Sequence, residues 1–233
     1  MLDTFYPPFP GFRPEGLDLL RQLKQHNERP WFQEHREHFE TELFWPARCL
    51  VAELDQLFAR EQLPLRSNPE RALFRIYRDV RFSSDKRPYK THVGMILSRS
   101  GQRMDPGVVY IHVEPDTPFL GAGFWRSERT VLTAFRQAML QDPEAFLEMK
   151  TSLEEAGLEL TARQTLKRFP RGFQVTPHDP RAPYLRFQSF LTRYPLSPET
   201  LYTRELLHEV FEFTRKTLPL LLWGWEALDS FSS

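Results

Sequence analysis

The sequence predicts an α+β fold with helices at the N-terminus, a central and mostly antiparallel sheet, and a C-terminal helix. Apolar residues recur at helical spacing through the first quarter of the chain, the period shortens to two from Ala72, and helical signals return after Ser127. A doubly wound sheet would need strands and helices in regular alternation, which this order does not provide. The pattern therefore favours segregated helices and strands.

The domain organisation follows from the absence of dividing segments. The 233 residues contain no internal repeat and no low-complexity linker. We therefore expect a single globular domain, residues 1–233, with a helical part at about 14–62 and a mixed α/β part at about 70–230.

The N-terminal helices are predicted from apolar spacing and prolines. Apolar residues share a helical face from Leu17 to Leu43, with a break at residues 27–30. Pro46 then starts or kinks a further helix that reaches Phe58.

The later elements are predicted from turn and capping residues. Apolar runs at 93–97 and 108–113 flank a turn region that contains glycine, which is typical of an antiparallel hairpin. Gly121 and Gly123 are interpreted as a turn before a helix that opens at Ser127.

Three further elements complete the prediction. Asp142 caps a helix that Gly157 can end, because glycine tolerates a left-handed exit. Residues 184–191 are expected to form a strand, and Ser197 opens the final helical region.

Composition excludes several classes of protein. The 31 basic and 31 acidic side chains give a formal net charge of 0, so no bulk attraction to nucleic acid or acidic membranes is expected. The most apolar stretch, residues 218–225, is far shorter than the roughly 20 residues that a bilayer requires. The single cysteine, Cys49, allows no internal disulfide, and the N-terminus does not read as a secretory signal. We therefore expect a cytoplasmic protein that does not interact with membranes.

Basic charge is nevertheless concentrated in two segments. Residues 71–90 hold seven basic and two acidic side chains, and residues 163–193 hold seven basic side chains and one acidic. The rest of the chain carries the opposing negative charge. If the fold brings the two segments together, their potential would hold a phosphate or another anion.

Residues 72–82 are predicted to form a strand with one apolar and one charged face. Arg75, Asp79 and Arg81 share the charged face, whereas Arg78 interrupts the apolar one. A guanidinium is rarely buried without partners, so Arg78 requires a carboxylate from elsewhere, a bulge that turns it outward, or a ligand.

The pattern Arg75-x-x-Arg78-Asp79-x-Arg81-Phe82-x-x-Asp85-Lys86-x-x-Tyr89 resembles the signature of an uncharacterised, mainly bacterial family called domain of unknown function 2461. The resemblance covers nearly the whole chain and includes Trp31-Phe32, Gly121-x-Gly123 and the run from Leu166 to Phe173. It implies a single-domain size and no established activity.

Three functions are compatible with these residues. The first is binding of a small ligand that bears phosphate or carboxylate, with or without chemistry, through an arginine-rich strand and the following turn. The second is a nucleic-acid-binding module with Phe74, Tyr77 and Phe82 as stacking surfaces, which the zero net charge makes the weaker hypothesis. The third is a structural or interaction protein whose arginines form a salt-bridge lattice with acidic helices that include Glu34, Glu37, Glu40 and Glu42. The candidate ligand-binding residues are Arg75, Arg78, Asp79, Arg81, Asp85, Lys86, Tyr89, Lys167, Arg168 and Arg171.

Other patterns carry less functional information. His35 and His38 are three residues apart on a helix, which favours a solvated face over a metal site. His112 shares a strand face with Tyr110 and is a candidate general base, although a hydrogen-bonded structural histidine is the favoured interpretation. No familiar nucleotide or catalytic motif is found, and we expect no metal and no cofactor. The sequence leaves open whether the protein is an enzyme and which oligomeric state it adopts.

Overall fold

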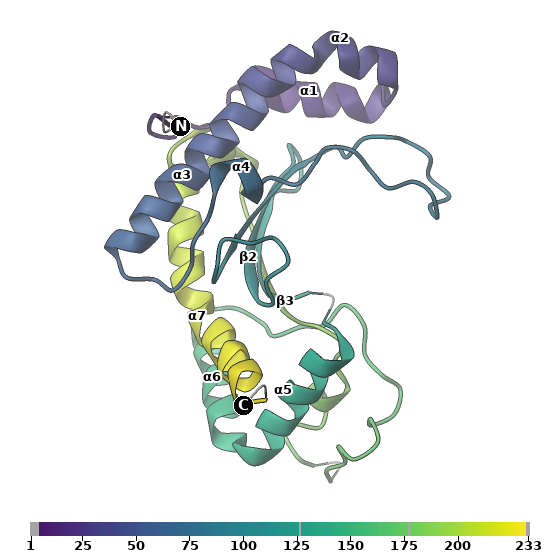
Figure 1. Cartoon of the computed structure of the whole chain (residues 1–233), viewed down its shortest axis with the longest axis vertical. Coiled ribbons are helices and arrows are strands. Elements are labelled where there is room, and N and C mark those ends of the chain that lie inside the picture. The colour runs from purple at the N-terminus through teal and green to yellow at the C-terminus, as the bar shows by residue number, and fades with distance from the viewer. Residues whose placement is uncertain (1–4, 126, 177, 232–233) are drawn as a thin grey trace. The chain divides into compact units, whose positions relative to one another are not determined.

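The computed structural model describes residues 5–125, 127–176 and 178–231 (Figure 1). Helices account for 48% of the chain and strands for 14%, and the long C-terminal helix follows the last strand, which confirms the predicted α+β class. No helix in the described ranges combines the length and the apolar character needed to cross a membrane.

The chain forms two compact units. Unit 1 comprises Met1–Asp105, Tyr110–Leu120 and Pro195–Glu212, and unit 2 comprises Pro106–Val109, Gly121–Tyr194 and Phe213–Ser233. The basic segment 71–90 therefore belongs to unit 1, and the basic segment 163–193 belongs to unit 2. The single domain expected from the sequence stays a prediction.

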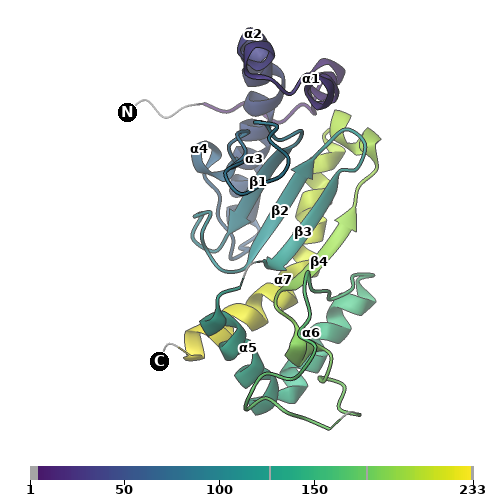
Figure 2. The same ribbon diagram turned by 90° about the vertical axis from the view of Figure 1, so that its right-hand side faces the viewer.

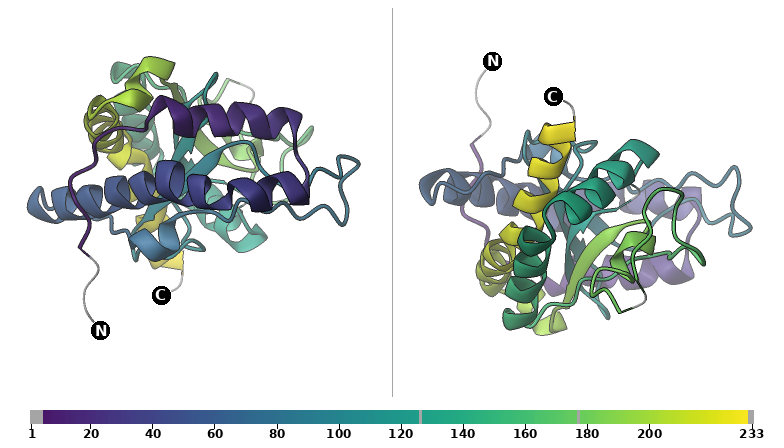
Figure 3. Two further views of the ribbon diagram at one scale, coloured as in Figure 1. Left: turned by 90° about the horizontal axis from the view of Figure 1, so that it is seen from above. Right: turned by 90° about the horizontal axis from the view of Figure 1, so that it is seen from below.

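Unit 1 begins with the helical pair expected from the sequence. Helices α1 (Pro14–Gln25) and α2 (Arg29–Phe39) lie side by side and antiparallel (Figure 3), and each has a proline in its first turn. A π-helical turn, η1 (Glu40–Phe44), joins α2 to α3 (Trp45–Arg60). Pro46 has no backbone N–H for the carbonyl of Glu42, so the ordinary helical ladder cannot continue across this junction.

Gly16 explains how closely α1 approaches this junction. A Cβ atom at position 16 would lie 2.5 Å from the carbonyl oxygen of Glu42, closer than real contacts allow. Glycine at this position therefore permits the contact between α1 and η1.

The sheet has the strand order β1 (Val93–Ser98), β2 (Val108–Val113), β3 (Phe119–Phe124) and β4 (Phe190–Pro195) (Figure 2). The first two strands confirm the predicted hairpin. Helix α3 packs against β1 and lies behind β1 and β2 in Figure 2. Ile111 and Val113 are fully buried, whereas Tyr110 and His112, which alternate with them along β2, are half-buried on the opposite face.

Two sequence interpretations of the sheet are wrong. Gly121 and Gly123 lie within β3 and do not form a turn. Gly123 has φ of +120°, and a Cβ atom there would lie 2.1 Å from the carbonyl oxygen of Phe190, so glycine serves the close approach to β4. The strand expected at 184–191 begins only at Phe190, because Pro183 precedes a 3₁₀ turn, η2 (Tyr184–Arg186).

The remaining helices agree with the predicted capping signals to within a few residues. Helix α5 (Arg129–Gln141) begins two residues after Ser127, and Asp142 caps α6 (Pro143–Glu155) by accepting a hydrogen bond from Ala145 N. The chain leaves α6 through Gly157 at φ of +74°. Asn68 caps the short α4 (Pro69–Ala72), and η3 (Pro198–Tyr202) precedes the long helix α7 (Glu205–Phe231).

Candidate functional site

The signature residues lie on an arm, residues 73–92, that projects from β1 in unit 1 (Figure 1). Its two halves run antiparallel, since Arg78 N donates to Pro88 O at 2.8 Å and Lys90 N donates to Ile76 O at 2.7 Å. At the base, Leu73 pairs with Met95 of β1. We call this segment the signature arm.

The strand predicted over residues 72–82 is not formed. The described backbone has only isolated bridges at Leu73 and Tyr77, and the chain turns at residues 81–82. Ile76 is buried as the apolar face predicts, but Phe82 is 96% exposed. The alternation of buried and exposed side chains therefore does not continue beyond Tyr77. From there to the turn, side chains contact near neighbours in the sequence.

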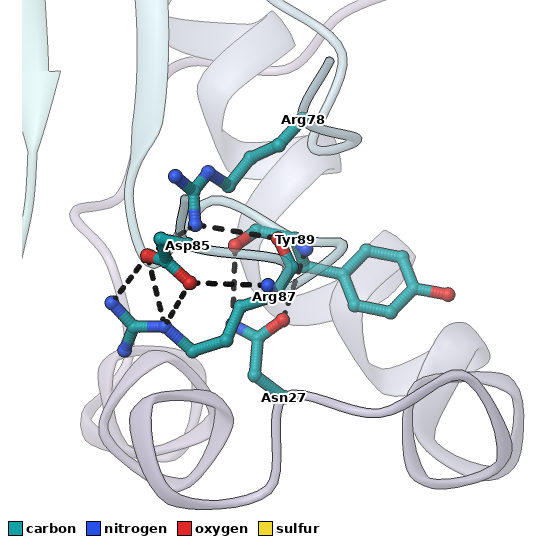
Figure 4. A network of polar contacts seen from close by, with 5 residues as sticks. All are labelled: Asn27, Arg78, Asp85, Arg87 and Tyr89. Atoms are coloured by element: carbon teal, nitrogen blue, oxygen red, sulfur yellow. Dashed lines mark hydrogen bonds and ion pairs between the residues drawn. The ribbon is translucent and has the colours of Figure 1, made fainter. Parts of the chain in front are cut away.

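The position of Arg78 on the apolar face requires a carboxylate, a bulge or a ligand. The structure provides a carboxylate, Asp85, from within the arm. Arg78 Nη1 donates to Asp85 Oδ2 at 2.6 Å and to the Arg87 carbonyl at 3.3 Å (Figure 4). Arg87 donates to the same carboxylate, from Nη2 at 2.8 Å and from Nε at 3.0 Å. Hydrogen bonds from Arg87 and then Arg78 hold the pKa of Asp85 far below its ordinary range. One carboxylate thus serves two guanidiniums, which leaves positive charge in excess.

Asp79 and Arg81 form a second local pair. Arg81 donates from Nε to Oδ1 at 3.0 Å and from Nη2 to Oδ2 at 2.7 Å. The side-chain hydrogen bond from Arg81 lowers the pKa of Asp79 to about 2. The Arg81 side chain is 77% exposed, so solvent weakens the contribution of this pair to stability.

The sequence contains a local signal for these pairs that the strand interpretation missed. Asp79-x-Arg81, Asp85-x-Arg87 and Asp179-x-Arg181 share one spacing and one geometry. In each, the aspartate accepts from the backbone N–H and the guanidinium of the arginine two positions later. Arg87, absent from the predicted site, could have been found from this repeated spacing.

Tyr89 anchors the arm to the helical pair. Tyr89 N donates to Asn27 Oδ1 at 2.9 Å, and Asn27 Nδ2 donates to Tyr89 O at 3.1 Å (Figure 4). The ring of Tyr89 stacks on Phe32 with centroids 4.3 Å apart, and the residue is only 2% exposed. Asn27 lies between α1 and α2, so this contact fixes the arm against their junction.

Two lysines bind backbone oxygens of the arm. Lys86 Nζ donates to Val80 O at 3.0 Å, and Lys90 Nζ donates to Arg75 O at 2.7 Å. The side chain of Arg75 is exposed and has no hydrogen bond or ion pair with the residues that the structure describes.

The predicted lattice with the acidic helices is not formed by Glu40 and Glu42 among the residues that the structure describes. Glu40 pairs with Arg48 and Glu42 pairs with Arg13, and neither arginine belongs to the arm. The ion pairs described for the arm's arginines are instead made to Asp79 and Asp85, which belong to the arm itself.

The second group of predicted residues, Lys167, Arg168 and Arg171, belongs to unit 2, whereas the other seven belong to unit 1. All three are exposed in a loop whose base pairs Thr165 with Phe187. Further along this loop, Arg181 Nη1 donates to Met139 O at 2.7 Å and ties it to α5.

The histidines predicted as weak candidates have structural contacts. The ring of His35 stacks on Trp31 with centroids 4.1 Å apart, and its Nδ1 lies 2.8 Å from Trp31 O. His112 Nδ1 lies 3.0 Å from the Tyr110 hydroxyl. In the ranges the structure describes, no group of three or more His, Cys, Asp or Glu side chains could hold a metal ion.

The fold and the arm define an α+β protein whose arginine-rich segment is organised by its own aspartates. Residues 15–223 match the family described as "Conserved hypothetical protein (DUF2461)". The chain therefore belongs to this family, which confirms the resemblance carried by the signature. No curated protein and no solved structure matches the chain.

Proposed function

We propose that the signature arm binds a small anionic ligand bearing phosphate or carboxylate. The observation that carries the proposal is the unbalanced charge of the arm: six basic side chains stand against Asp79 and Asp85 alone. Arg75 is exposed without a carboxylate partner among the described residues, and Arg78 shares Asp85 with Arg87.

Contacts within unit 1 also hold the arm in place. The paired aspartates hold the guanidiniums of Arg78 and Arg87, and Asn27 holds the backbone at Tyr89. Ordering a long side chain on binding costs about 0.5–1.5 kcal/mol, so side chains that are already held bind an anion at lower entropic cost. Guanidinium groups suit the planar, bidentate geometry of carboxylate and phosphate oxygens.

Thermal unfolding in the presence of inorganic phosphate or citrate tests this proposal, with Arg75→Gln as the variant. Arg75 makes no described side-chain contact, so its replacement should leave the fold intact. A ligand at about 100 times its Kd stabilises the folded state by about 2.7 kcal/mol. We expect a rise in Tm for the wild type that Arg75→Gln removes.

Arg60→Gln is the matched control, because Arg60 is also an exposed arginine of unit 1 and, among the described residues, pairs with its neighbour Glu61. It should retain the full ligand-induced rise in Tm. Equal rises in the wild type and Arg75→Gln, or none in any protein, would refute the proposal.

One observation favours single-stranded nucleic acid as a second candidate. Phe82 is 96% exposed and Tyr77 is 52% exposed, and the Arg81 guanidinium lies 5.9 Å from the centroid of the Phe82 ring. Stacking of one base on such a ring contributes about 1–3 kcal/mol. Fluorescence anisotropy with a labelled oligonucleotide separates the two functions, because Phe82→Ala should weaken oligonucleotide binding and leave the phosphate-induced rise in Tm unchanged.

A further inference from the structure

A polar cluster beside the base of the signature arm lies on the half-buried face of β2, the strand between β1 and β3 in Figure 2. Tyr110 and His112 lie on this face, and Glu114 follows them at the same spacing just after the strand. His92, which precedes β1, and Phe119 of β3 contact the same imidazole ring. All five residues belong to unit 1.

Three of these residues form a continuous polar chain. The Tyr110 hydroxyl lies 3.0 Å from His112 Nδ1, and His112 Nε2 lies 3.5 Å from Glu114 Oε2. Lys24 Nζ lies 2.9 Å from Glu114 Oε1, and Thr117 donates to Oε2 at 2.8 Å. These cationic and hydroxyl donors favour the ionised form of Glu114.

The charge on Glu114 assigns the tautomer of His112. A lone pair on Nε2 would face a carboxylate and be repelled, so Nε2 carries a proton. In the neutral ring, Nδ1 then accepts a hydrogen bond from the Tyr110 hydroxyl. A hydroxyl, an imidazole and a carboxylate in this order form the arrangement by which hydrolases activate a nucleophile.

The surroundings fix the imidazole ring in place. His112 lies between His92, with centroids 4.2 Å apart, and Phe119, with centroids 4.4 Å apart. Burial, followed by the proximity of His112, lowers the pKa of His92 to about 4. His92 is therefore neutral at pH 7.

Tyr110 is positioned by Gly94. A Cβ atom at position 94 would lie 2.7 Å from the Tyr110 hydroxyl oxygen, so glycine makes room for this group. Phe74 packs against Tyr110 with centroids 6.0 Å apart, and Lys90 Nζ lies 5.5 Å from the Phe74 centroid. Lys90 thus adds positive charge at this edge of the cluster.

We propose that Tyr110, His112 and Glu114 form a general acid–base site that exchanges a proton between the Tyr110 hydroxyl and an oxygen of a small anionic substrate. Tyr110 is the catalytic residue, and His112 and Glu114 are positioning residues. The site goes beyond the anion binding proposed for the arm and does not depend on it.

The proton balance of this step is complete within the three residues and solvent. When the substrate oxygen takes the Tyr110 proton, the tyrosinate that is left takes a proton from solvent, and His112 stays neutral with Nε2–H toward Glu114. In the reverse direction, His112 Nδ1 accepts the Tyr110 proton while the tyrosine oxygen receives one from the substrate. The imidazolium then releases its Nδ1 proton to solvent, which restores the neutral ring.

Methanesulfonyl fluoride probes the reactivity that this arrangement gives to Tyr110. The tyrosine oxygen attacks sulfur, an O–S bond forms, the S–F bond breaks, and fluoride leaves while His112 Nδ1 takes the phenolic proton. Burial raises the pKa of Tyr110 to about 12, so an unassisted hydroxyl would stay protonated and unreactive at neutral pH. Peptide mass spectrometry then measures the rate of labelling at each tyrosine.

Tyr77 provides the internal control because it is 52% exposed and its described ring contacts are to Phe32 and Tyr89, not to a histidine. We expect Tyr110 to be labelled faster than Tyr77, His112→Asn to slow labelling about 100-fold, and Glu114→Gln to slow it about 10-fold. The comparison of the two tyrosines uses the wild-type chain, so it holds even if a variant does not fold. No labelling at Tyr110, or a rate that Glu114→Gln leaves unchanged, would overturn the proposal.

Discussion

Asn27→Ala tests whether the signature arm is held by the helical pair. Asn27 is 8% exposed, and its amide makes two hydrogen bonds to the backbone of Tyr89, at 2.9 and 3.1 Å. Truncation to alanine leaves a buried N–H and a buried C=O without partners, and each such group costs about 1–3 kcal/mol. Since the two losses share one site, we expect the free energy of unfolding to fall by about 2–4 kcal/mol.

Urea denaturation gives the free energy, and hydrogen exchange at the Lys90 amide reports on the arm itself. A loss of 2 kcal/mol or more corresponds to exchange that is about 30-fold faster or greater. Asn68→Ala is a matched control, because Asn68 makes one exposed capping bond to Glu70 N and its loss costs only about 1 kcal/mol. If Asn27→Ala changes the free energy by less than about 0.5 kcal/mol, a level typical of surface substitutions, the anchoring argument is wrong.

Two further predictions concern the arm and the sheet. The folded pKa of Asp79, about 2, lies below its ordinary 3.8, so its ionised form stabilises the protein above about pH 4, and this contribution is lost as the pH falls toward 2. Carboxyl NMR titration should show this pKa returning toward 3.8 in Arg81→Gln, and an unchanged value would contradict the pairing. Gly123→Ala should cost more than about 3 kcal/mol in denaturation experiments, because its Cβ would lie 2.1 Å from Phe190 O at φ of +120°. Gly157→Ala, at φ of +74° in open space, should cost only about 1 kcal/mol, and similar losses at both sites would refute the steric argument.

Interactions between near neighbours account for the parts of the fold that could be predicted. The helical break at residues 27–30, the cap at Asp142 and the exit through Gly157 all depend on groups a few residues apart. Gly123 was misinterpreted because its requirement for glycine comes from Phe190, 67 positions later in the chain. No local pattern contains that information.

In the candidate site, too, contacts between near neighbours could be predicted from the sequence and contacts between distant residues could not. Asp85 and Arg87 are two residues apart, so their pairing can be predicted from the sequence. Asn27 and Tyr89 are hydrogen-bonded although they are 62 positions apart, and no local pattern indicates that contact. A period of two predicts a buried Phe82 only if the strand continues to that residue, whereas Phe82 is 96% exposed. The aspartate–arginine pairs at residues 79–81 and 85–87 instead favour turns, and their repeated spacing was the signal that could have corrected the assignment.

The contacts of the arm indicate that some signature residues maintain its structure and that others supply charge. Arg78, Asp85 and Tyr89 hold the arm in shape, so we expect their replacement to disturb local order together with the proposed ligand binding. Arg75 contributes charge without a described side-chain contact, so its replacement changes ligand binding alone if the proposal is correct. Asp85→Asn distinguishes the effect of geometry from the effect of charge, because it removes the carboxylate that the guanidiniums of Arg78 and Arg87 share. If their held geometry matters more than their charge, phosphate should bind Asp85→Asn more weakly than the wild type, although the arm gains a positive charge.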